Sequence, residues 1–254
     1  MIGNTAGGCQ KRMIRASSGP AARGEPGPGR EKVTPLMAEH RTRHSAARPP
    51  VRTPPGASTR RQHTVRIIGG QWKRTPLPVT DAPGLRPTPD RVRETLFNWL
   101  THHCGGDLAG RRVLDLFAGT GALGFEAASR GARPVLLVEQ NAVLVRQLRA
   151  IRDKLGADPI DIRQADALAT LAGCAARGER FDIILLDPPF GAGWLPRLLP
   201  LLPGLLTPDG YVYAEAESAL GALCATDEAL LAPFEVLKAD KAGQVFYHLL
   251  RCKI

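Results

Sequence analysis

From residue 111 onward, apolar and polar positions alternate between the pattern of buried strands and that of amphipathic helices. Short apolar runs predict strands at residues 113–117, 134–138, 160–163, 181–186 and 211–214. A helical stretch follows the second run, beginning at Asn141. Because helices separate these strands, we expect a parallel sheet with both faces covered.

Two further apolar runs close the chain, at residues 234–237 and 245–250. Lys241, Ala242 and Gly243 lie between them, and a short glycine-containing connection of this kind predicts an antiparallel hairpin. The expected fold class is therefore α/β, with a mostly parallel sheet that ends in an antiparallel pair.

The region before the sheet carries its own pattern. Residues 65–68 predict a short strand, and Gly69-Gly70 predict a turn. Thr88, Pro89 and Asp90 predict a helix start, with Thr88 as the N-cap and Pro89 at the first helical position. The apolar stripe of this helix consists of Val92, Leu96, Trp99 and Leu100. We predict three regions: residues 1–64, 65–110 and 111–254.

Composition separates the first region from the rest. Residues 1–64 hold 12 Lys and Arg against 3 acidic residues, whereas residues 65–254 hold 22 against 21, so the net charge of +10 is concentrated at the start. The first region contains 8 Pro, 8 Gly and no aromatic residue, which predicts disorder. Three interpretations stay open for it: an arm that contacts RNA phosphates, an extension without a role, and a transit peptide.

Several classes of protein are disfavoured. The 5 cysteines are scattered and form no C-x-x-C, so neither a disulfide framework nor a zinc site is indicated, and we expect no metal. No apolar run reaches the length of a membrane span. We expect a cytoplasmic, monomeric protein without a membrane partner.

A glycine-rich motif follows the first strand of the sheet. Gly119, Gly121 and Gly124 spell G-x-G-x-x-G between an expected strand and an expected helix, after Phe117. Glu139 lies 20 residues past Gly119, at the end of the next strand, where a carboxylate can hold two ribose hydroxyls. The motif fits a nucleotide cofactor, but it does not separate a dinucleotide dehydrogenase from a methyltransferase.

Asp115 favours the second class. It places a carboxylate at the strand end just before the glycines, where a dehydrogenase must hold a pyrophosphate. S-Adenosylmethionine, which is cationic and has an amino-acid end, would be attracted there. Asp166, after the third strand, is a candidate acceptor for the adenine amino group, although capping the next helix is the simpler alternative.

The sequence Asp187-Pro188-Pro189-Phe190 follows the apolar run at residues 181–186. Its prolines stiffen the turn at the carboxyl end of a central strand, where α/β sheets bind ligands. The Asp187 carboxylate and the Pro188 carbonyl are two acceptors for an exocyclic amino group of a base. Phe190 offers a ring on which the base can stack. We therefore expect the catalytic residues here.

Basic residues gather in the second region and predict a phosphate-binding surface. A solvated charged face is the alternative. The expected RNA-binding residues are Arg66, Lys73, Arg74, Arg86, Thr88, Arg91 and Arg93.

Together these segments resemble the RsmD family. The resemblance spans residues 65–252 and is carried by VRIIGGQW, by GLRPTPDRVRETLFNWL, by the loop FAGTGALG and by DPPF. The late KAGQV and the acidic Glu215-Ala216-Glu217 add to it. The resemblance implies a class I methyltransferase fold with seven strands and methylation of the N2 atom of a guanine in small-subunit ribosomal RNA, either free or in an assembled subunit.

Three rival functions stay open on the residues alone. A dehydrogenase would have no use for DPPF. A DNA adenine methyltransferase shares DPPF but normally carries a target-recognition region, for which only residues 65–110 are available. A non-catalytic ribosome-assembly factor would not need Asp187, whose presence favours catalysis.

Overall fold

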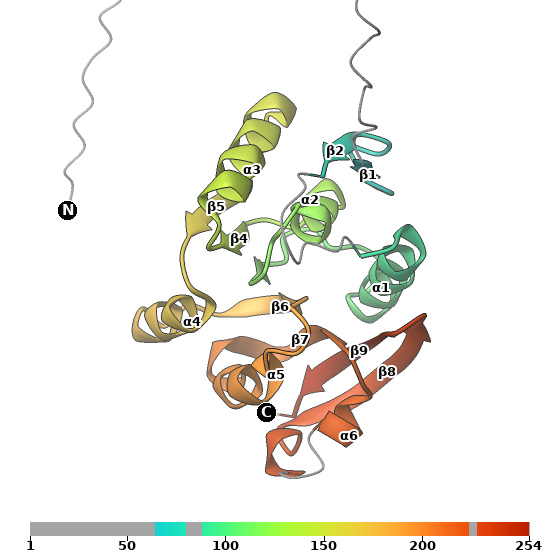
Figure 1. Ribbon diagram of the computed structural model, residues 1–254, viewed down its shortest axis with the longest axis vertical. Helices are drawn as coiled ribbons and strands as arrows, with labels where there is room; N and C mark the ends of the chain where they lie inside the picture. The colour runs from blue at the N-terminus through green and yellow to red at the C-terminus, as the bar shows by residue number, and fades with distance from the viewer. Residues whose placement is uncertain (1–63, 80–87, 224–227, 254) are drawn as a thin grey trace, which may run out of the picture. The chain divides into compact units, whose positions relative to one another are not determined.

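The computed structural model describes residues 64–79, 88–223 and 228–253, which lie within one unit and form a large and a small sheet (Figure 1). The strands are β1 (Thr64–Arg66), β2 (Pro76–Pro78), β3 (Val113–Asp115), β4 (Val135–Glu139), β5 (Ile160–Gln164), β6 (Phe181–Leu186), β7 (Leu206–Ala216), β8 (Phe234–Ala242) and β9 (Val245–Cys252). The α-helices are α1 (Asp90–His103), α2 (Ala122–Ser129), α3 (Ala142–Leu155), α4 (Ala167–Ala176), α5 (Trp194–Leu198) and α6 (Leu220–Leu223). Short 3-10 turns lie at Leu199–Leu201, Pro203–Leu205 and Glu228–Leu230.

The large sheet has seven strands in the order β5-β4-β3-β6-β7-β9-β8. Neighbours from β5 to β7 are parallel, and β9 pairs antiparallel with both β7 and β8. The predicted fold class, including the terminal hairpin, is confirmed. From β3 the chain winds outward to β4 and β5, then returns to β6 on the other side of β3. This reversal opens a crevice at the carboxyl ends of β3 and β6, where open α/β sheets bind ligands.

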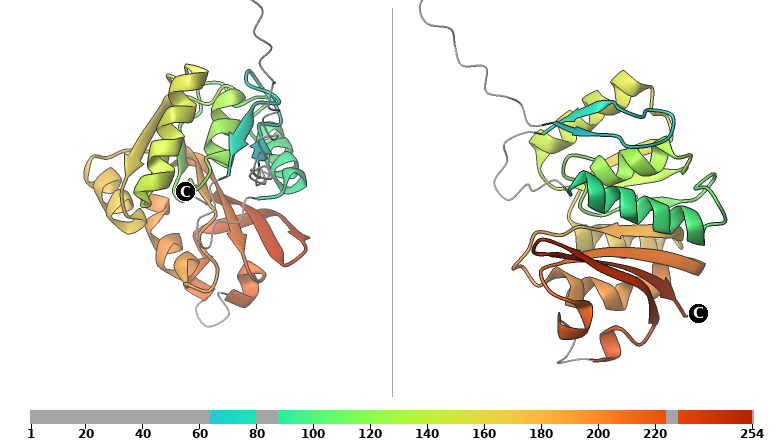
Figure 2. Two further views of the ribbon diagram at one scale, coloured as in Figure 1. Left: turned by 45° about the horizontal axis from the view of Figure 1, so that its top comes forward. Right: turned by 90° about the vertical axis from the view of Figure 1, so that its right-hand side faces the viewer.

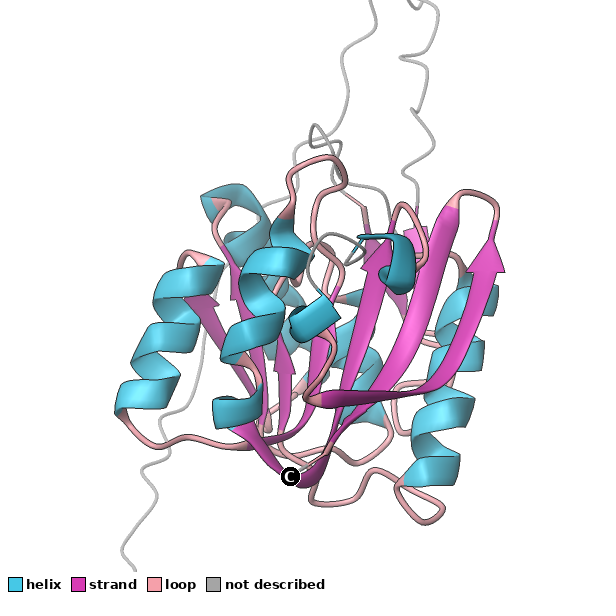
Figure 3. Cartoon of the chain, turned by 90° about the horizontal axis from the view of Figure 1, so that it is seen from below, coloured by secondary structure: helices cyan, strands magenta, loops and turns pink. Residues whose placement is uncertain are grey.

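The sheet lies between two helical layers (Figure 3). Alternate residues of each strand face opposite layers: Val113 belongs to the core under α1, α2 and α3, whereas Leu114 belongs to the core with α4, α5 and α6. Burial on both faces explains why the central strands read as continuous apolar runs rather than as alternating ones. Figure 2 shows the two layers from other sides.

Most predicted boundaries hold to within a few residues. β6 covers the predicted span, and Asn141 caps α3 by accepting from the Val143 amide at 2.8 Å. β7 is longer than predicted because it starts at Leu206, before the polar Thr207-Pro208-Asp209. Leu206 already pairs with Phe181 of β6, so tertiary pairing extends the strand through residues that a local pattern assigns to a loop.

The small sheet belongs to the segment that precedes the large one. β1 pairs antiparallel with β2, whose two prolines are tolerated because both strands are edges of a two-stranded sheet. Val65, Ile67 and Leu77 are buried in the same core as the sheet. The hydrophobic side of this segment therefore closes one face of the α/β fold.

The start of α1 corrects one prediction. Pro89, not Thr88, is the N-cap, and no side chain caps the helix. The buried Thr88 hydroxyl instead donates a hydrogen bond to Asp187 Oδ2 at 3.0 Å. The N-cap prediction for Thr88 was wrong because its hydroxyl hydrogen-bonds to Asp187, 99 residues later in the chain, instead of capping the helix.

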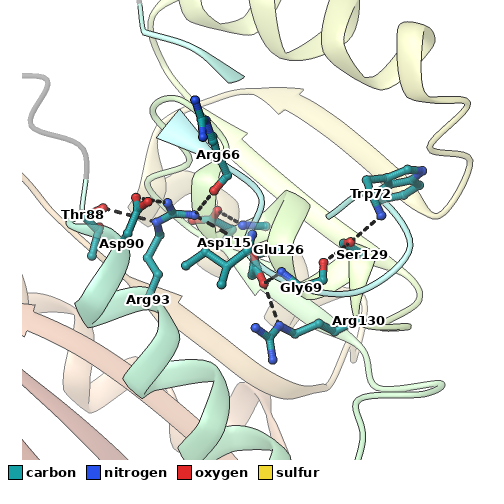
Figure 4. A network of polar contacts seen from close by, with 12 residues as sticks. Arg66, Gly69, Trp72, Thr88, Asp90, Arg93, Asp115, Glu126, Ser129 and Arg130 are labelled. Atoms are coloured by element: carbon teal, nitrogen blue, oxygen red, sulfur yellow. Dashed lines mark hydrogen bonds and ion pairs between the residues drawn. The ribbon is translucent and has the colours of Figure 1, made fainter. Parts of the chain in front are cut away.

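Arg93 of α1 is the largest fully buried side chain in the described structure (Figure 4). Its guanidinium donates to the Arg66 carbonyl at 2.8 Å, to the Thr88 carbonyl at 3.3 Å and to Asp90 Oδ1 at 2.6 Å. One buried cation therefore ties β1, the residues before α1 and α1 itself together.

Glu126 of α2 is the anionic partner of this cluster. Its Oε2 lies 3.9 Å from Arg93 Nη1, and its two oxygens accept the amides of Ile68 at 2.6 Å and Gly69 at 2.8 Å. Arg130 donates to Oε1 at 2.7 Å. One turn further, Ser129 accepts the Trp72 amide and donates to the Gly69 carbonyl. The turn after β1 is thus held by the helix that follows the glycine loop.

These contacts correct the expected RNA-binding set. Arg93 is 0% exposed and its nitrogens are used inside the protein, so it cannot contact RNA in this conformation. Two other predictions lie outside the described residues: Arg86, and nearly all of the predicted tail at residues 1–64.

Replacing Arg93 by Met is expected to lower the free energy of unfolding by about 2–4 kcal/mol, because buried carbonyls and Glu126 lose their donor. Arg91→Met, at an exposed position on the same helix, should change it by less than about 0.5 kcal/mol. Urea unfolding of both variants tests this. Equal stabilities would show that the buried network contributes nothing.

Candidate active site

A cavity of about 400 Å³ lies at the carboxyl ends of β3, β4 and β6. It is bordered by the glycine-rich loop, by the ends of β4 and β5, by DPPF and by the residues before α1. The predicted site residues that line it are Thr88, Asp115, Phe117, Gly119, Glu139, Asp166, Asp187, Pro188, Pro189 and Phe190. The structure therefore brings the expected cofactor residues and the expected catalytic residues to one cavity.

The glycines of the loop are required by its geometry. Gly121 has a φ of 79° and is the N-cap of α2, and a Cβ there would come within 2.6 Å of Phe125 and Leu148. A Cβ on Gly124 would lie 2.7 Å from Leu137 and 3.0 Å from Asp115. Gly121 and Gly124 shape the loop from behind, whereas Gly119 lines the cavity itself.

Asp115 ends β3 beneath this loop. It is buried, and its Oδ2 accepts the Gly124 amide at 2.9 Å. Its Oδ1 is buried without a hydrogen-bond partner among the described residues. Burial raises the pKa of Asp115 to about 7, against the opposing effect of the Gly124 amide. A carboxylate oxygen without a partner in a cavity wall fits a ligand with a cationic ammonium group.

Glu139 and Asp166 both line the cavity and also hold backbone. Glu139 Oε2 accepts the Gly119 amide at 3.0 Å and Oε1 accepts the Asn141 amide at 2.7 Å, so it joins the glycine loop to the end of β4. Asp166 caps α4 by accepting the Ala169 amide at 3.0 Å. Asp166 therefore does cap α4, as the alternative interpretation held, and its side chain still lines the cavity.

Asp187 lies where β6 ends, with the Thr88 hydroxyl on Oδ2. Its pKa is raised well above the usual value, first because burial removes water and next because of the negative charge of Glu215. A hydrogen bond with the Glu215 side chain raises it further. Asp187 is therefore a carboxyl group whose proton affinity is raised by its surroundings.

Aromatic rings line one part of the cavity. Phe190 is exposed to 39%, which is unusual for a ring of its size in this protein. Phe117 and Trp194 meet edge to face with their ring centres 5.3 Å apart. The cavity thus offers apolar faces beside its carboxylates. Sequence reasoning missed Trp194, because α5 is too short for a periodicity to show.

Glu215 is a further cavity residue to which the sequence motifs assigned no role. It is 2% exposed, and the Tyr213 hydroxyl donates to its Oε1 at 2.8 Å. The sequence contained a signal for Glu215. A carboxylate is rarely found within a buried run such as Tyr213-Ala214-Glu215-Ala216, at the end of a strand, unless it has a specific partner or function. Only the sheet order shows that β7 lies beside β6, which places Glu215 next to Asp187.

The remaining basic residues of the expected RNA surface are exposed. Arg66, Lys73, Arg74 and Arg91 reach solvent from β1, the turn after it and α1. Pro89, which directly precedes α1, lines the cavity. No group of residues suited to a metal ion and no helix able to cross a membrane occurs among the described residues.

Comparison with known proteins places this site in a family. The family model described as "Conserved hypothetical protein 95" matches residues 65–251. The chain is 40% identical over 187 residues to "Ribosomal RNA small subunit methyltransferase D" of Escherichia coli strain K12, which covers 73% of this chain and 88% of that relative. The chain belongs to this family. The resemblance to the RsmD family is thereby confirmed.

Solved structures agree. The chain is similar to "Putative methyltransferase yhhF from Escherichia coli", with a TM-score of 0.63, 38% identity, and coverage of 75% of this chain and 98% of that one. It also matches "A putative sam-dependent methyltransferase from Streptococcus mutans", with a TM-score of 0.59, 17% identity, and coverage of 77% and 57%. The second likeness shows the fold alone. Fold and family support S-adenosylmethionine as the expected cofactor.

Asp115→Asn is expected to weaken the binding of S-adenosylhomocysteine at least tenfold, because the carboxylate that would pair with its ammonium group is gone. The same change should raise the Tm of the ligand-free protein at pH 8. The ionised buried carboxylate opposes folding above its folded pKa of about 7, and this penalty fades as the pH falls toward the unfolded value of 3.8.

Calorimetry and thermal unfolding at pH 8 and pH 5 test both effects. The stability gain should be present at pH 8 and largely lost at pH 5. Unchanged ligand affinity would remove Asp115 from the cofactor site, and a lower Tm at pH 8 would contradict the proposed cost of the charge.

Proposed function

We propose that this protein transfers a methyl group from S-adenosylmethionine to the exocyclic N2 amino group of a guanine in small-subunit ribosomal RNA. The observation that carries the proposal is the single cavity that joins Asp115 and the glycine loop to Asp187 and DPPF. Relatives at 40% and 36% identity are named as small-subunit ribosomal RNA methyltransferases.

The chain offers a separate contact for each part of the cofactor. Asp115 Oδ1 lacks a partner among the described residues and suits the ammonium group. Glu139 suits the ribose hydroxyls and Asp166 the adenine amino group, since both line the cavity beyond the loop. When bound, the cofactor supplies an electrophilic methyl group on a sulfonium ion.

The residues at the end of β6 would activate and place the amino group. The lone pair of a guanine N2 atom is delocalised into the ring, so the nitrogen is a weak nucleophile. Acceptors at Asp187 and Pro188 would hold its hydrogens and favour a pyramidal nitrogen whose lone pair faces the methyl group. Thr88 donates to one Asp187 oxygen and so orients the carboxyl group. The reaction would be accelerated by positioning the N2 atom and by electrostatic stabilisation of the transition state, and no covalent intermediate is required.

The carboxyl groups that line the cavity at the ends of β6 and β7 favour guanine over adenine as the target base. The Watson–Crick edge of guanine presents donors at N1 and N2, whereas that of adenine presents a donor at N6 and an acceptor at N1. Asp187 and Glu215 place two carboxyl groups on this wall. Two adjacent acceptors suit two adjacent donors. Phe190 is exposed at the cavity and suits stacking by a base that has left its helix.

The RNA backbone would lie on the exposed basic residues. Arg66, Lys73, Arg74 and Arg91 come from the segment that also supplies Thr88 and Pro89 to the cavity. A surface of this kind binds phosphates without reading sequence, so the choice of nucleotide depends on which base can reach the cavity.

Asp187→Asn is expected to lower the single-turnover methylation rate by roughly 100-fold, because an amide can present a donor where an acceptor is needed. The affinity for S-adenosylhomocysteine should hardly change, since Asp115, Glu139 and Asp166 are intact. The exposed Asp161→Asn of β5 is the matched control and should keep the full rate.

The same assay identifies the product. Ribosomal RNA, free or within the small subunit, is incubated with labelled cofactor, and its nucleosides are then separated. N2-methylguanosine is expected. N6-methyladenosine as the product would contradict guanine as the target base. A normal methylation rate in Asp187→Asn would show that DPPF is a structural turn without a catalytic role.

Replacing Arg66 and Arg91 together by Ala should raise the dissociation constant for RNA and reduce the slope of its salt dependence by about 2. The pair Arg146→Ala and Arg149→Ala on the exposed side of α3 is the control of equal charge. Filter binding across a salt series measures both. If the two double variants bind alike, the phosphate surface lies elsewhere.

A further inference from the structure

We propose that Glu217 is a positioning residue for the target base, which holds the loop after DPPF through the Gly191 amide and so keeps the Phe190 ring at the cavity. The proposal rests on the methyl transfer proposed above. It gives a role to the second glutamate of Glu215-Ala216-Glu217, to which neither the cofactor site nor the catalytic residues assign one.

The loop that carries Phe190 contains two glycines that widen its choice of backbone conformations. It consists of residues 190–193, between β6 and α5. Gly191 and Gly193 have φ values of 75° and 59°, and a Cβ on either would meet nothing within 4 Å. Close packing therefore does not require these glycines, unlike those of the motif before α2. Since glycine lacks the Cβ that restricts other residues, the loop loses backbone entropy when it is held in one conformation.

Packing does not hold Phe190 in place either. Phe190 belongs to neither of the two buried cores, and it is 39% exposed at the cavity. Among the described residues, and outside the hydrogen bonds of α5 itself, one hydrogen bond is found for residues 190–193: the Gly191 amide donates to Glu217 Oε2 at 2.6 Å. The position of the Phe190 ring thus depends on this contact.

Glu217 is suited to this contact because the sheet fixes its backbone. It follows Ala216, the last residue of β7, which is buried and pairs with Phe246 of β9. Hydrogen bonds from an amide to a carboxylate are short and roughly twice as strong as those between neutral groups. Glu217 therefore ties a loop with little packing of its own to a strand that has a neighbour on either side.

A smaller cavity, of about 30 Å³, adjoins the first and connects the same residues. Five residues line both cavities: Pro188, Pro189, Phe190, Trp194 and Glu215. Gly191 and Glu217 line the smaller cavity and not the larger one. Glu217 thus lies next to the cavity but outside it, so it would act through Phe190 and not on the reacting atoms.

The charge of Glu217 by itself would have the opposite effect on RNA. An exposed carboxylate repels phosphates, so its removal would strengthen RNA binding if charge alone mattered. A positioning role predicts weaker capture of the base when Glu217 is removed, because Phe190 is then in place for only a fraction of the time. The two roles therefore predict changes of opposite sign.

Glu217→Ala is expected to lower kcat/KM for the methylation of small-subunit ribosomal RNA about fivefold, as for the loss of one exposed hydrogen bond to a carboxylate. Glu217→Gln keeps an acceptor oxygen and should stay within about twofold of the unchanged protein. The affinity for S-adenosylhomocysteine and the Tm should hardly change in either variant, because Glu217 is exposed and lies outside the larger cavity. The control is Glu235→Ala, an exposed glutamate of β8 that pairs with Arg251, and it should keep the full kcat/KM.

A double-mutant cycle with Phe190→Ala shows whether Glu217 acts through the ring. In the Phe190→Ala background, Glu217→Ala should change kcat/KM by less than about twofold, because there is no ring left to position. Equal losses in the two backgrounds would overturn the positioning role. An equal increase in kcat/KM in Glu217→Ala and Glu217→Gln would overturn it as well, in favour of charge repulsion.

A second measurement needs no RNA. Labelling phenylalanine with carbon-13 at the carbonyl and glycine with nitrogen-15 selects the amides that follow phenylalanine, and Phe190-Gly191 is the one Phe-Gly pair in the sequence. The Gly191 amide therefore gives a single signal whose assignment follows from the sequence. In Glu217→Ala its proton should move upfield and exchange faster with solvent, whereas Glu217→Gln and Glu235→Ala should keep it protected.

The two kinds of measurement separate this inference from the proposed function. A Gly191 amide that stays equally protected in Glu217→Ala, or an unchanged kcat/KM in that variant, would overturn the positioning role and leave the proposed function intact. If the unchanged protein methylates no ribosomal RNA, the proposed function fails. The positioning of the base then fails with it, even where the Gly191 signal shows the contact with Glu217.

Discussion

The buried Arg93–Glu126 contact is the constraint on which the other parts of the structure depend. Glu126 belongs to α2, the helix that starts at the glycine loop, and Arg93 belongs to α1. Their partners include Arg66, Ile68 and Gly69, so the pair also fixes the turn of the first small strand. Because a buried charge must be paired, these three segments can adopt only arrangements in which both charges stay satisfied.

This constraint reaches the active site through a short path. Arg93 donates to the Thr88 carbonyl, and the Thr88 hydroxyl donates to Asp187. The segment before the sheet thus does two things: its outer side presents exposed basic residues, and its inner side positions an acceptor at the end of β6. The proposed RNA contacts and the orientation of Asp187 therefore depend on residues of the same segment.

The cavity concentrates carboxyl groups whose charges oppose folding. Burial raises the pKa of both Asp115 and Asp187, and Glu215 adds to the second. Such groups are tolerated where a ligand offers what the protein lacks. A cationic cofactor suits Asp115, and an amino group with hydrogens to donate suits Asp187. These carboxyl groups lower the stability of the ligand-free protein. They also make the cavity selective for ligands that carry a positive charge or donate hydrogen bonds.

The sequence by itself determined the order of strands and helices, the glycine loop, DPPF and the family. These depend on local patterns, since burial on both faces makes a continuous apolar run and a tight turn requires glycine. It did not determine the roles of Thr88, Arg93 and Glu215. A buried and an exposed arginine look alike in a sequence, and Glu215 meets Asp187 only because β7 lies beside β6. Their roles depend on partners distant along the chain, and only the tertiary structure brings those partners within reach.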